Sequence, residues 1–324
     1  MVRLSIVATL YRSAPHLEEF YTRVSRSARQ LTSDYEVVLV NDGSPDNSLE
    51  LAQALVDRDE RVRLVDLSRN FGHHKAMMTG LRHARGELVF LIDSDLEEEP
   101  ELLGPFAETL QTTGADVIYG VQRGRRGGFV ERWSGRLFFK IFNVLSDYAI
   151  PENLVTVRLM TRRYVSALVA HPERETMIAG LWAETGFRQV PFQITKHHTS
   201  STTYSFAHKV AVLVNSITSF SSRPLEMIFY LGLTIFSVAL AAAAYLVVRR
   251  VFFGILLPGW PSLIVSVWLL GGLILACVGV IGIYLSKIFI ETKQRPYTIV
   301  RSVYERQPGH AGSSDSRDSR ALLR

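Results

Sequence analysis

Two long stretches without a charged side chain restrict this chain more than any other feature. Residues 227–248 and residues 251–286 contain no Asp, Glu, Lys or Arg, and only Arg249 and Arg250 lie near their junction. A helix needs about 20 predominantly apolar residues to cross a bilayer. Core helices of soluble domains rarely stay uncharged over such a length. Each stretch is therefore long and apolar enough to span a membrane.

A break inside the second stretch indicates where the second span begins. Pro258, Trp260 and Pro261 lie close together there. Prolines interrupt helices, and tryptophan is enriched at membrane interfaces. The pattern predicts two transmembrane helices, at about residues 225–248 and 262–290, joined by a short loop. A pair of spans returns the chain to the side from which it entered.

Lysine and arginine around these spans predict the orientation of the chain. The connecting loop carries only Arg249 and Arg250. The side that holds both chain ends carries six basic residues, which are Lys209, Arg223, Lys287, Lys293, Arg295 and Arg301. Because basic residues collect on the cytoplasmic side, we expect an inner-membrane protein whose soluble part and both termini face the cytoplasm. The first 20 residues show no apolar segment typical of an export signal.

The remaining chain divides further. We expect a globular domain over residues 1–204 and an amphipathic helix on the membrane surface over residues 205–224, with a similar amphipathic pattern at residues 133–145. A post-membrane segment over residues 291–306 precedes a tail over residues 307–324, which is rich in Gly, Ser, Asp and Arg and is expected to be disordered. Glycines in the second span offer faces for close helix packing, which leaves a homo-oligomer open as well as a monomer.

Composition excludes several other classes of protein. The 47% apolar content excludes a disordered chain. A net charge of +5, from 36 basic and 31 acidic residues, does not indicate a nucleic-acid-binding surface, so we expect no nucleic acid partner. The single cysteine, Cys277, excludes an intramolecular disulfide and a cysteine-based zinc cluster.

The first 120 residues alternate short apolar runs with helix-length amphipathic stretches. The apolar runs lie at residues 4–8, 35–40, 62–67, 88–92 and 116–121, and the helical stretches lie at residues 15–31, 47–58, 73–85 and 100–112. This alternation predicts an α/β fold with a mainly parallel sheet between two layers of helices. Ligands of such sheets bind at the carboxyl ends of the strands, which are therefore the candidate site.

Two of those strand ends carry carboxylates. Asp42 follows the second run in an Asn-Asp-Gly-Ser turn, where it can accept hydrogen bonds or cap the next helix. Asp93 and Asp95 directly follow the fourth run, and their oxygens can approach one cation from the same side, a solvated turn being the alternative. Such ligands suit Mg²⁺ or Mn²⁺, which would neutralise a diphosphate. Glu97 is a candidate third ligand or water-mediated partner, whereas the other nearby acids suit a helix start at Pro100.

Basic residues follow two other strand ends. Lys75 lies at a predicted helix start in Asn-Phe-Gly-His-His-Lys, where it and the backbone amides can face a phosphate. The two histidines of that segment are either metal ligands or part of a polar helix start. Arg123 and Arg126 lie in a glycine-rich loop after the fifth run and can bind phosphate through paired hydrogen bonds. The alternative for this loop is a solvated basic segment or one that contacts anionic headgroups.

Taken in order, these segments resemble the family 2 glycosyltransferases of the dolichyl- and polyprenyl-phosphate sugar synthase type, and in particular their bacterial branch with two transmembrane helices. The resemblance extends from residue 3 to about residue 304. It rests on six segments, at residues 40–44, 70–81, 84–87, 93–96, 219–225 and 291–296.

The resemblance implies a GT-A fold and gives roles to the candidate residues on the donor side. Asp42 would contact the nucleotide base. Asp93 and Asp95 would hold a divalent metal on the diphosphate of a nucleotide sugar. Arg123 and Arg126 would lie beside the phosphates.

On the acceptor side the resemblance assigns Arg158, within Val-Arg-Leu-Met. Thr156 stands where the family often carries an Asp, and residues 11–13, 97–100 and 202–204 also depart from the family pattern. These departures cluster on the sugar and acceptor side, while the nucleotide and metal side keeps the pattern.

The sequence therefore predicts an inverting enzyme that transfers a hexose or modified hexose from a nucleotide diphosphate to polyprenyl phosphate. A phosphate dianion needs no strong general base, so Thr156 in place of Asp is compatible with this reaction. Two alternatives stay open. One is transfer to a hydroxyl of a lipid-linked glycan, with Asp147 or Glu152 as the base. The other is a membrane-anchored scaffold that binds nucleotide sugars without turnover.

Overall fold

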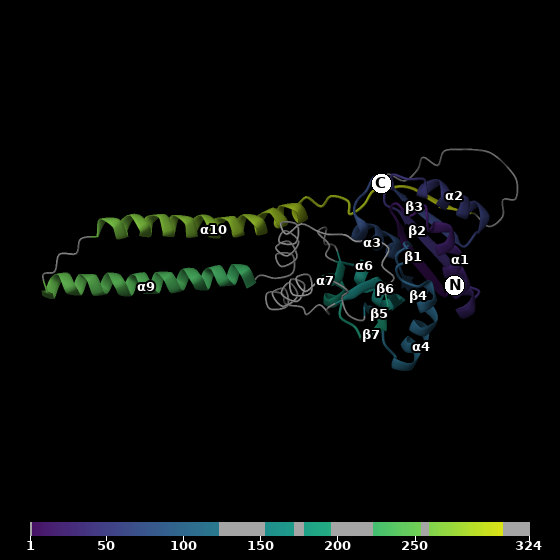
Figure 1. Ribbon diagram of the computed structural model, residues 1–324, viewed down its shortest axis with the longest axis horizontal. Helices are drawn as coiled ribbons and strands as arrows, with labels where there is room; N and C mark the ends of the chain where they lie inside the picture. Colours follow the sequence, from purple (N-terminus) through teal and green to yellow (C-terminus); the bar gives the residue numbers. More distant parts are fainter. Residues whose placement is uncertain (1, 123–152, 172–177, 196–222, 254–258, 307–324) are drawn as a thin grey trace.

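The computed structural model describes residues 2–122, 153–171, 178–195, 223–253 and 259–306 (Figure 1). Within these parts, an α/β domain is followed by two long helices. Several predicted features lie wholly or almost wholly outside the described residues: Arg123, Arg126, the stretch at residues 133–145, the surface helix at residues 205–224 and the tail at residues 307–324.

The described part of the α/β domain is built on one eight-stranded sheet with the strand order β7-β5-β6-β4-β1-β2-β3-β8. The strands β1 to β4 are parallel to one another and β7 is parallel to β5, whereas β6 and β8 run antiparallel to their neighbours. The strands are β1 (Leu4–Leu10), β2 (Tyr35–Asn41), β3 (Val62–Leu67), β4 (Leu88–Leu91), β5 (Val117–Gln122), β6 (Leu154–Thr161), β7 (Gln189–Ile194) and β8 (Val300–Glu305).

Helices cover both faces of this sheet, and each face has its own apolar core. Side chains of α1, α2 and α4 pack on one face and those of α3, α6 and α7 on the other. Every residue of β1, β2 and β3 is buried, which explains why these strands are nearly continuous apolar runs. The helices are α1 (Leu17–Leu31), α2 (Ser48–Arg58), α3 (His73–His83), the short η1 (Pro100–Leu102), α4 (Leu103–Thr113), α6 (Arg162–Val169) and α7 (Ile178–Glu184).

The predicted α/β fold with a mainly parallel sheet is confirmed, but three strands were missed. The five apolar runs form β1 to β5, and the four helical stretches form the helices between them. The prediction did not include β6, β7 or β8. The last of these lies in the segment expected only to follow the membrane. Its residues alternate between half-buried and exposed, as is typical of a short edge strand, so no long apolar run marks it.

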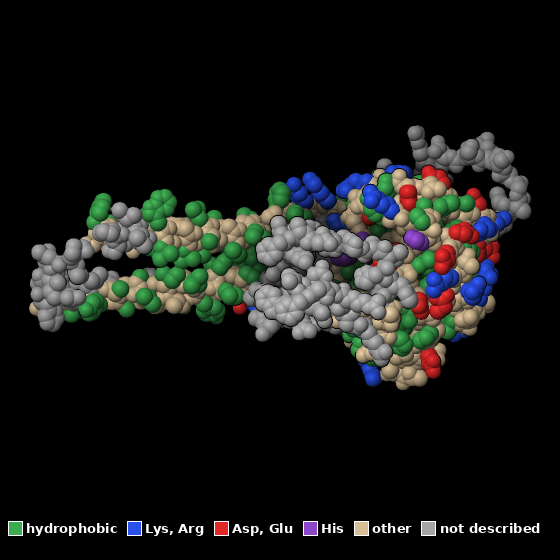
Figure 2. Space-filling model, viewed as in Figure 1, with side chains coloured by type: hydrophobic (Ala, Val, Ile, Leu, Met, Phe, Trp, Pro, Cys, Tyr) green, Lys and Arg blue, Asp and Glu red, His purple; other side chains and the backbone are tan. Residues whose placement is uncertain are grey.

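Two long helices extend from the α/β domain. α9 (Arg223–Phe253) and α10 (Trp260–Thr292) lie side by side (Figure 1). Their large hydrophobic side chains are mostly exposed, with Trp268 79% exposed (Figure 2). In the part of the chain that the structure describes, one helical segment, Ser266–Thr292, is long and apolar enough to cross a membrane. The first predicted span coincides with α9, and its insertion stays a prediction.

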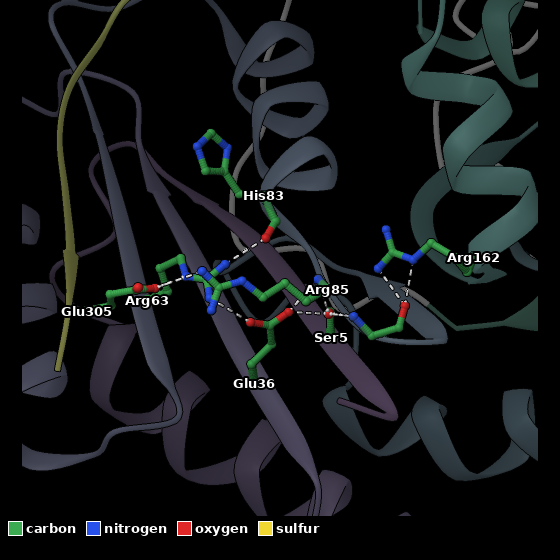
Figure 3. Close-up of polar contacts among 8 residues, drawn as sticks. Ser5, Glu36, Arg63, His83, Arg85, Arg162 and Glu305 are labelled. Carbon is green, nitrogen blue, oxygen red and sulfur yellow. Dashed lines mark hydrogen bonds and ion pairs between the residues drawn. The ribbon is translucent and has the colours of Figure 1, made fainter. Parts of the chain in front are cut away.

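A buried polar network lies at the amino ends of the parallel strands (Figure 3). Glu36 of β2 accepts hydrogen bonds from the Ser5 hydroxyl and from the backbone amide of Arg85, each at 2.6 Å. Arg63 of β3 lies 3.3 Å from Glu36 and 2.6 Å from Glu305 of β8. A buried charge that loses its partner is strongly destabilising. These contacts therefore help to hold β8, which follows the long helices, against the sheet.

At the opposite ends of the strands, Asp46 joins the loop after β1 to the loop after β2. Its Oδ1 accepts hydrogen bonds from the hydroxyls of Ser44 (2.5 Å) and Ser48 (2.6 Å) and from the Ser48 amide (3.2 Å), and its Oδ2 accepts one from the Ala14 amide (3.1 Å). Partial burial acts to raise the pKa of Asp46, but these hydrogen bonds outweigh it and lower the pKa to about 2. The ionised carboxylate therefore stabilises both loops.

We expect Gly80→Ala to destabilise the protein, because α3 lies very close to the sheet at this residue. An added Cβ would be 2.5 Å from Val7 Cγ1 and 2.9 Å from Val40 Cγ2, both on buried strands. Overpacking of this kind lowers the free energy of unfolding by about 1–3 kcal/mol. Gly104→Ala on α4 is the matched control, since its Cβ would meet nothing within 4 Å, and it should be neutral or gain up to about 1 kcal/mol. Equal urea unfolding curves for the two variants would contradict the expectation.

We expect Asp46→Asn to lower the free energy of unfolding by about 1–2 kcal/mol at pH 7, since a neutral amide cannot replace a carboxylate that accepts four hydrogen bonds. The pKa of Asp46 is lower in the folded protein, so its contribution is complete above the unfolded pKa of about 3.9 and is lost as the pH falls towards 2. Urea unfolding measured between pH 7 and pH 2.5 should show the variant and wild type converging. Asp57→Asn, at an exposed carboxylate on α2, serves as the control. A difference that is constant with pH would show that the ionised group is not responsible.

Candidate functional site

The parallel pairing of β2, β1 and β4 brings the predicted site residues to one side of the sheet, where the carboxyl ends of these strands lie. This side is called the carboxyl edge below. β1 lies between the other two strands, with Leu10 opposite Asn41 of β2 and Val7 opposite Leu91 of β4. The chain leaves β2 at Asp42 and β4 just before Asp93. The two predicted carboxylate segments therefore flank the end of β1, as expected for ligand sites of parallel sheets.

Asp42 is buried and binds the start of α3. Its Oδ1 accepts a hydrogen bond from the Phe71 amide at 2.7 Å, and its Oδ2 accepts one from the Gly72 amide at 3.0 Å. Burial raises the pKa of Asp42, although these two amides act against the shift. Asp42 therefore does not cap α2, whose N-cap residue is Asn47. It joins the loop after β2 to the loop that leads into α3.

The turn after β2 requires glycine at position 43. Its φ of +58° lies in the left-handed region that side chains rarely adopt. A Cβ at this position would lie 2.5 Å from the backbone nitrogen of Asn70. The loops after β2 and β3 are therefore in direct backbone contact. This contact brings together two of the segments that carry the family resemblance, at residues 40–44 and 70–81.

Asp93 lies beside a histidine whose contact with it was not predicted. His73, the first residue of α3, has its Nε2 3.3 Å from Asp93 Oδ1, while its Nδ1 lies 3.1 Å from the hydroxyl of Thr9 on β1. Partial desolvation acts against the charged imidazole, but the hydrogen bond and charge of Asp93, with the charges of Asp42 and Asp95, raise the pKa of His73. A metal ligand and a polar helix start were the two predictions for this histidine pair. The contact with Asp93 arises because α3 crosses β1 and β2, which places its first turn at this end of the strands, and no local sequence pattern indicates that crossing.

The turn after β4 presents Asp95 to solvent. Ser94 is buried, and its hydroxyl donates a hydrogen bond to the Thr9 carbonyl (2.8 Å) and lies 2.9 Å from the Ser13 hydroxyl. Asp95 is exposed, and its Oδ1 accepts a hydrogen bond from the Glu97 amide at 3.0 Å. Ser94 thus anchors the turn to the end of β1, and the two carboxylates on either side of it are held at the same edge.

The carboxylates of Asp93 and Asp95 fit Mg²⁺ or Mn²⁺ only if the substrate supplies further metal ligands. Within the described ranges, no group of three or more His, Cys, Asp or Glu side chains is arranged to hold a metal ion. Asp93 and Asp95 nevertheless provide carboxylate oxygens, and Mg²⁺ is commonly held by one or two carboxylates together with substrate phosphates. Glu97 is buried, and its part as a third ligand stays a prediction.

Arg158 of β6 is fully buried next to this edge. It is paired with Leu91 of β4 across the sheet and is 1% exposed. Its Nε donates to the Thr156 carbonyl at 3.2 Å, and its guanidinium lies over the ring of Trp182. Burial lowers the pKa of Arg158 to about 9, although nearby charges including that of Glu98 act against the shift. The predicted acceptor-side residue is thus close to the site but enclosed within the protein.

Glu98 is a further buried carboxylate near this site, and it was not among the predicted site residues. It is fully buried, and its Oε1 accepts a hydrogen bond from the backbone amide of Thr156 at 3.2 Å. The sequence pattern predicts only that Glu98 belongs to the helix start at Pro100. Its actual contact joins the turn after β4 to β6, which no local sequence pattern indicates.

Lys75 lies in the first turn of α3, as predicted, and reaches a residue beyond the long helices. Its Nζ lies 5.7 Å from the centre of the Tyr297 ring. Arg82, two turns along the same helix, contacts the same ring from 4.9 Å. Arg123 and Arg126, the predicted phosphate-binding residues, lie outside the described part of the chain.

Comparisons with protein families and with individual proteins agree on the family to which this chain is similar. Glycosyl transferase family 2 matches residues 5–169. A protein of Mycobacterium tuberculosis (strain CDC 1551 / Oshkosh), named "Putative glycosyltransferases", is 54% identical to this chain. The match covers 94% of this chain and 89% of that protein. The prophage bactoprenol glucosyl transferase homolog of Escherichia coli (strain K12) is 31% identical over 93% of this chain and 99% of its own length.

Among solved structures, the chain is similar to glucosyl-3-phosphoglycerate synthase from Mycobacterium tuberculosis in complex with uridine diphosphate. The similarity has a TM-score of 0.46 and 18% sequence identity, and it covers 67% of this chain and 79% of that chain.

The region that the family matches includes the edge of the sheet with Asp42, Asp93 and Asp95, and the two relatives cover α9 and α10 as well. The predicted resemblance to family 2 glycosyltransferases is therefore confirmed. The chain belongs to glycosyl transferase family 2 and is a glycosyltransferase.

Proposed function

We propose that this glycosyltransferase transfers a sugar from a nucleotide diphosphate sugar to polyprenyl phosphate at the cytoplasmic face of the inner membrane. The observation that carries the proposal is the combination of two features in one chain. Carboxylates gather at the carboxyl edge of a parallel sheet, and a long helix with exposed apolar side chains, Ser266–Thr292, follows it. Relatives named bactoprenol glucosyl transferase match nearly the whole chain, which supports glucose as the first sugar to test.

On the donor side, we assign binding of the nucleotide to Asp42 and binding of the metal-diphosphate end to Asp93 and Asp95. When bound, Mg²⁺ or Mn²⁺ would neutralise charge on the diphosphate. Asp42 and Asp93 flank the end of β1, so a nucleotide diphosphate laid across this edge would place its base and its phosphates at different carboxylates. In the same proposal, Glu97 assists Asp95.

The basic residues of the proposed site balance the charge of the substrates. Lys75, in the first turn of α3, lies at the helix end that attracts anions. Arg123 and Arg126 complete the phosphate contacts as the leaving diphosphate gains charge. Arg158 acts on the acceptor side from its buried position beside β4, where it holds the backbone of β6 at Thr156.

The reaction is a single displacement. An oxygen of the acceptor phosphate forms a bond to the anomeric carbon, the bond from that carbon to the donor's diphosphate oxygen breaks, and the nucleoside diphosphate leaves with the electron pair. The configuration at the anomeric carbon inverts. An acceptor phosphate monoester, with a second pKa of about 6, is mostly dianionic at neutral pH and loses no proton in the reaction. This agrees with Thr156 occupying a position where the family often has an Asp.

The same proposal places both α9 and α10 in the membrane. Their exposed apolar side chains would contact lipid tails, and the polyprenyl chain of the acceptor would lie in the same bilayer. Lys287 and Lys293 at the end of α10, with Arg223 at the start of α9, lie at the ends nearest the α/β domain, as expected for its cytoplasmic location (Figure 1).

We expect purified protein in detergent to transfer label from a nucleotide sugar to polyprenyl phosphate in the presence of Mg²⁺ or Mn²⁺. The donors to compare are UDP-glucose, UDP-galactose, UDP-N-acetylglucosamine and GDP-mannose, with the product measured in the organic phase after extraction. Reactions without polyprenyl phosphate and with heat-treated protein are the controls. If none of these donors gives an extractable product, the proposed acceptor and donor class are wrong.

We expect Asp95→Ala to reduce turnover by about 100-fold or more at limiting metal, because the variant loses one of two proposed carboxylate ligands. Its melting temperature should stay close to that of wild type, since the Asp95 side chain is exposed rather than packed in the core. Asp34→Ala, at an exposed carboxylate before β2 and thus at the other edge of the sheet, is the matched control. Chelation by EDTA should abolish wild-type turnover, and added Mn²⁺ should restore it. Wild-type activity of Asp95→Ala at limiting metal would remove the metal assignment.

A further inference from the structure

Arg301 occupies an irregular position in the strand that follows the long helices. In the antiparallel pairing of β3 with β8, Asp66 lies opposite Ser302, but the next residue, Leu67, lies opposite Val300. Arg301 is therefore the extra residue of a β-bulge. Bulges bend a strand and redirect a side chain, and they are frequent beside active sites.

The bulge brings Arg301 to a buried carboxylate at the end of β3. Arg301 Nη1 lies 3.3 Å from Asp66 Oδ2, and its Nη2 donates to the Ser68 carbonyl at 2.8 Å. The Asp66 side chain is 1% exposed, whereas that of Arg301 is 55% exposed. A buried carboxylate needs a nearby positive charge to stay ionised without a large desolvation penalty. Arg301 supplies that charge from the surface.

Asp66 in turn contacts the loop that carries the proposed nucleotide-binding residue. The side-chain amide of Asn41 donates to Asp66 Oδ1 at 2.8 Å, and the Asn41 side-chain oxygen, Oδ1, accepts a hydrogen bond from the backbone amide of Ser44 at 3.2 Å. Asp42 and Gly43 lie between these two residues. A continuous series of contacts thus runs from Arg301 through Asp66 and Asn41 to the turn that contains Asp42.

The charge of Asp66 fixes which way the Asn41 side chain points. An ionised carboxylate only accepts hydrogen bonds, so Asn41 must turn its NH₂ group towards Asp66. Its oxygen is then available to the Ser44 amide. Arg301, which lies beside the other oxygen of the same carboxylate, therefore helps to hold Asp66 in the position that orients Asn41.

We propose that Arg301 is a positioning residue for donor binding, acting through Asp66 and Asn41 on the turn at residues 41–44. The inference rests on the proposed function, because it takes Asp42 as the residue that contacts the nucleotide. It also means that the donor site is completed by a strand that the chain reaches only after α10. The part of the enzyme after the proposed membrane helices is thus required for donor recognition as well as for the fold.

The test compares Arg301→Gln with Arg306→Gln in the full-length protein in detergent. Arg306 follows the same strand and donates to the Asp57 carbonyl at 3.2 Å, away from the turn. With Arg301→Gln we expect faster amide hydrogen exchange in peptides covering residues 41–48 of the ligand-free protein. We also expect about tenfold weaker UDP binding and a similar rise in the KM for UDP-glucose, with kcat changed less than about twofold. Arg306→Gln should match wild type in each measurement.

Two further variants separate positioning from general loss of structure. Arg301→Lys keeps the positive charge and should retain most of the UDP affinity. Arg301 and Asp66 belong to the same series of contacts, so the double variant Arg301→Gln with Asp66→Asn should bind UDP about as weakly as Arg301→Gln alone. Simple loss of stability would instead worsen in the double variant and would affect kcat as well as KM.

The outcomes distinguish this inference from the proposed function. Hydrogen exchange at residues 41–48 needs neither turnover nor a known donor. If wild type binds no UDP and transfers no sugar, the proposed function fails, while the exchange comparison still decides whether Arg301 orders the turn. Equal exchange in Arg301→Gln and Arg306→Gln, or a double variant that binds UDP much more weakly than Arg301→Gln, would overturn the positioning role.

Discussion

Burial of the parallel strands on both faces is the constraint on which the rest of this structure depends. β1, β2 and β3 are buried at every residue, so polar side chains on them must be paired or must lie where the strands end. Asp42 and Asp93 follow the ends of β2 and β4, and the parallel pairing through β1 brings them to the same edge. The candidate site residues of this glycosyltransferase are therefore gathered where the apolar strands end.

Pairing of buried charges determines how the end of the chain joins the domain. Arg63 lies between Glu36 and Glu305 near the amino end of β3, and Asp66 lies beside Arg301 near the carboxyl end of the same strand. Each pair connects β8 to the core strands, and both involve a side chain buried to more than nine-tenths. α10 ends at Thr292 and β8 begins at Val300, so residues 293–299 join the second long helix to a strand that belongs to the sheet.

The acceptor that we propose is compatible with one departure of this chain from the family pattern. A phosphate dianion brings its own negative charge and needs no residue to remove a proton, so Thr156 can occupy a position where a carboxylate is common in the family. The demands on the protein are then to bind two anionic substrates and to hold them in line. Carboxylates for a metal at one strand end and basic residues around α3 suit that task.

Local patterns in the sequence determined the parallel sheet, the helices between its strands and the positions of Asp42, Asp93 and Asp95, because apolar runs and polar strand ends are properties of neighbouring residues. Two long uncharged stretches likewise predicted α9 and α10. Tertiary structure decided what depends on contacts between distant segments. The alternating, half-polar residues of β8 gave no signal of a strand, and the contacts of His73 with Asp93, of Glu98 with Thr156 and of Arg301 with Asp66 join residues that no local pattern relates. Which charges pair is set by the order of strands in the sheet, and that order is a property of the folded chain as a whole.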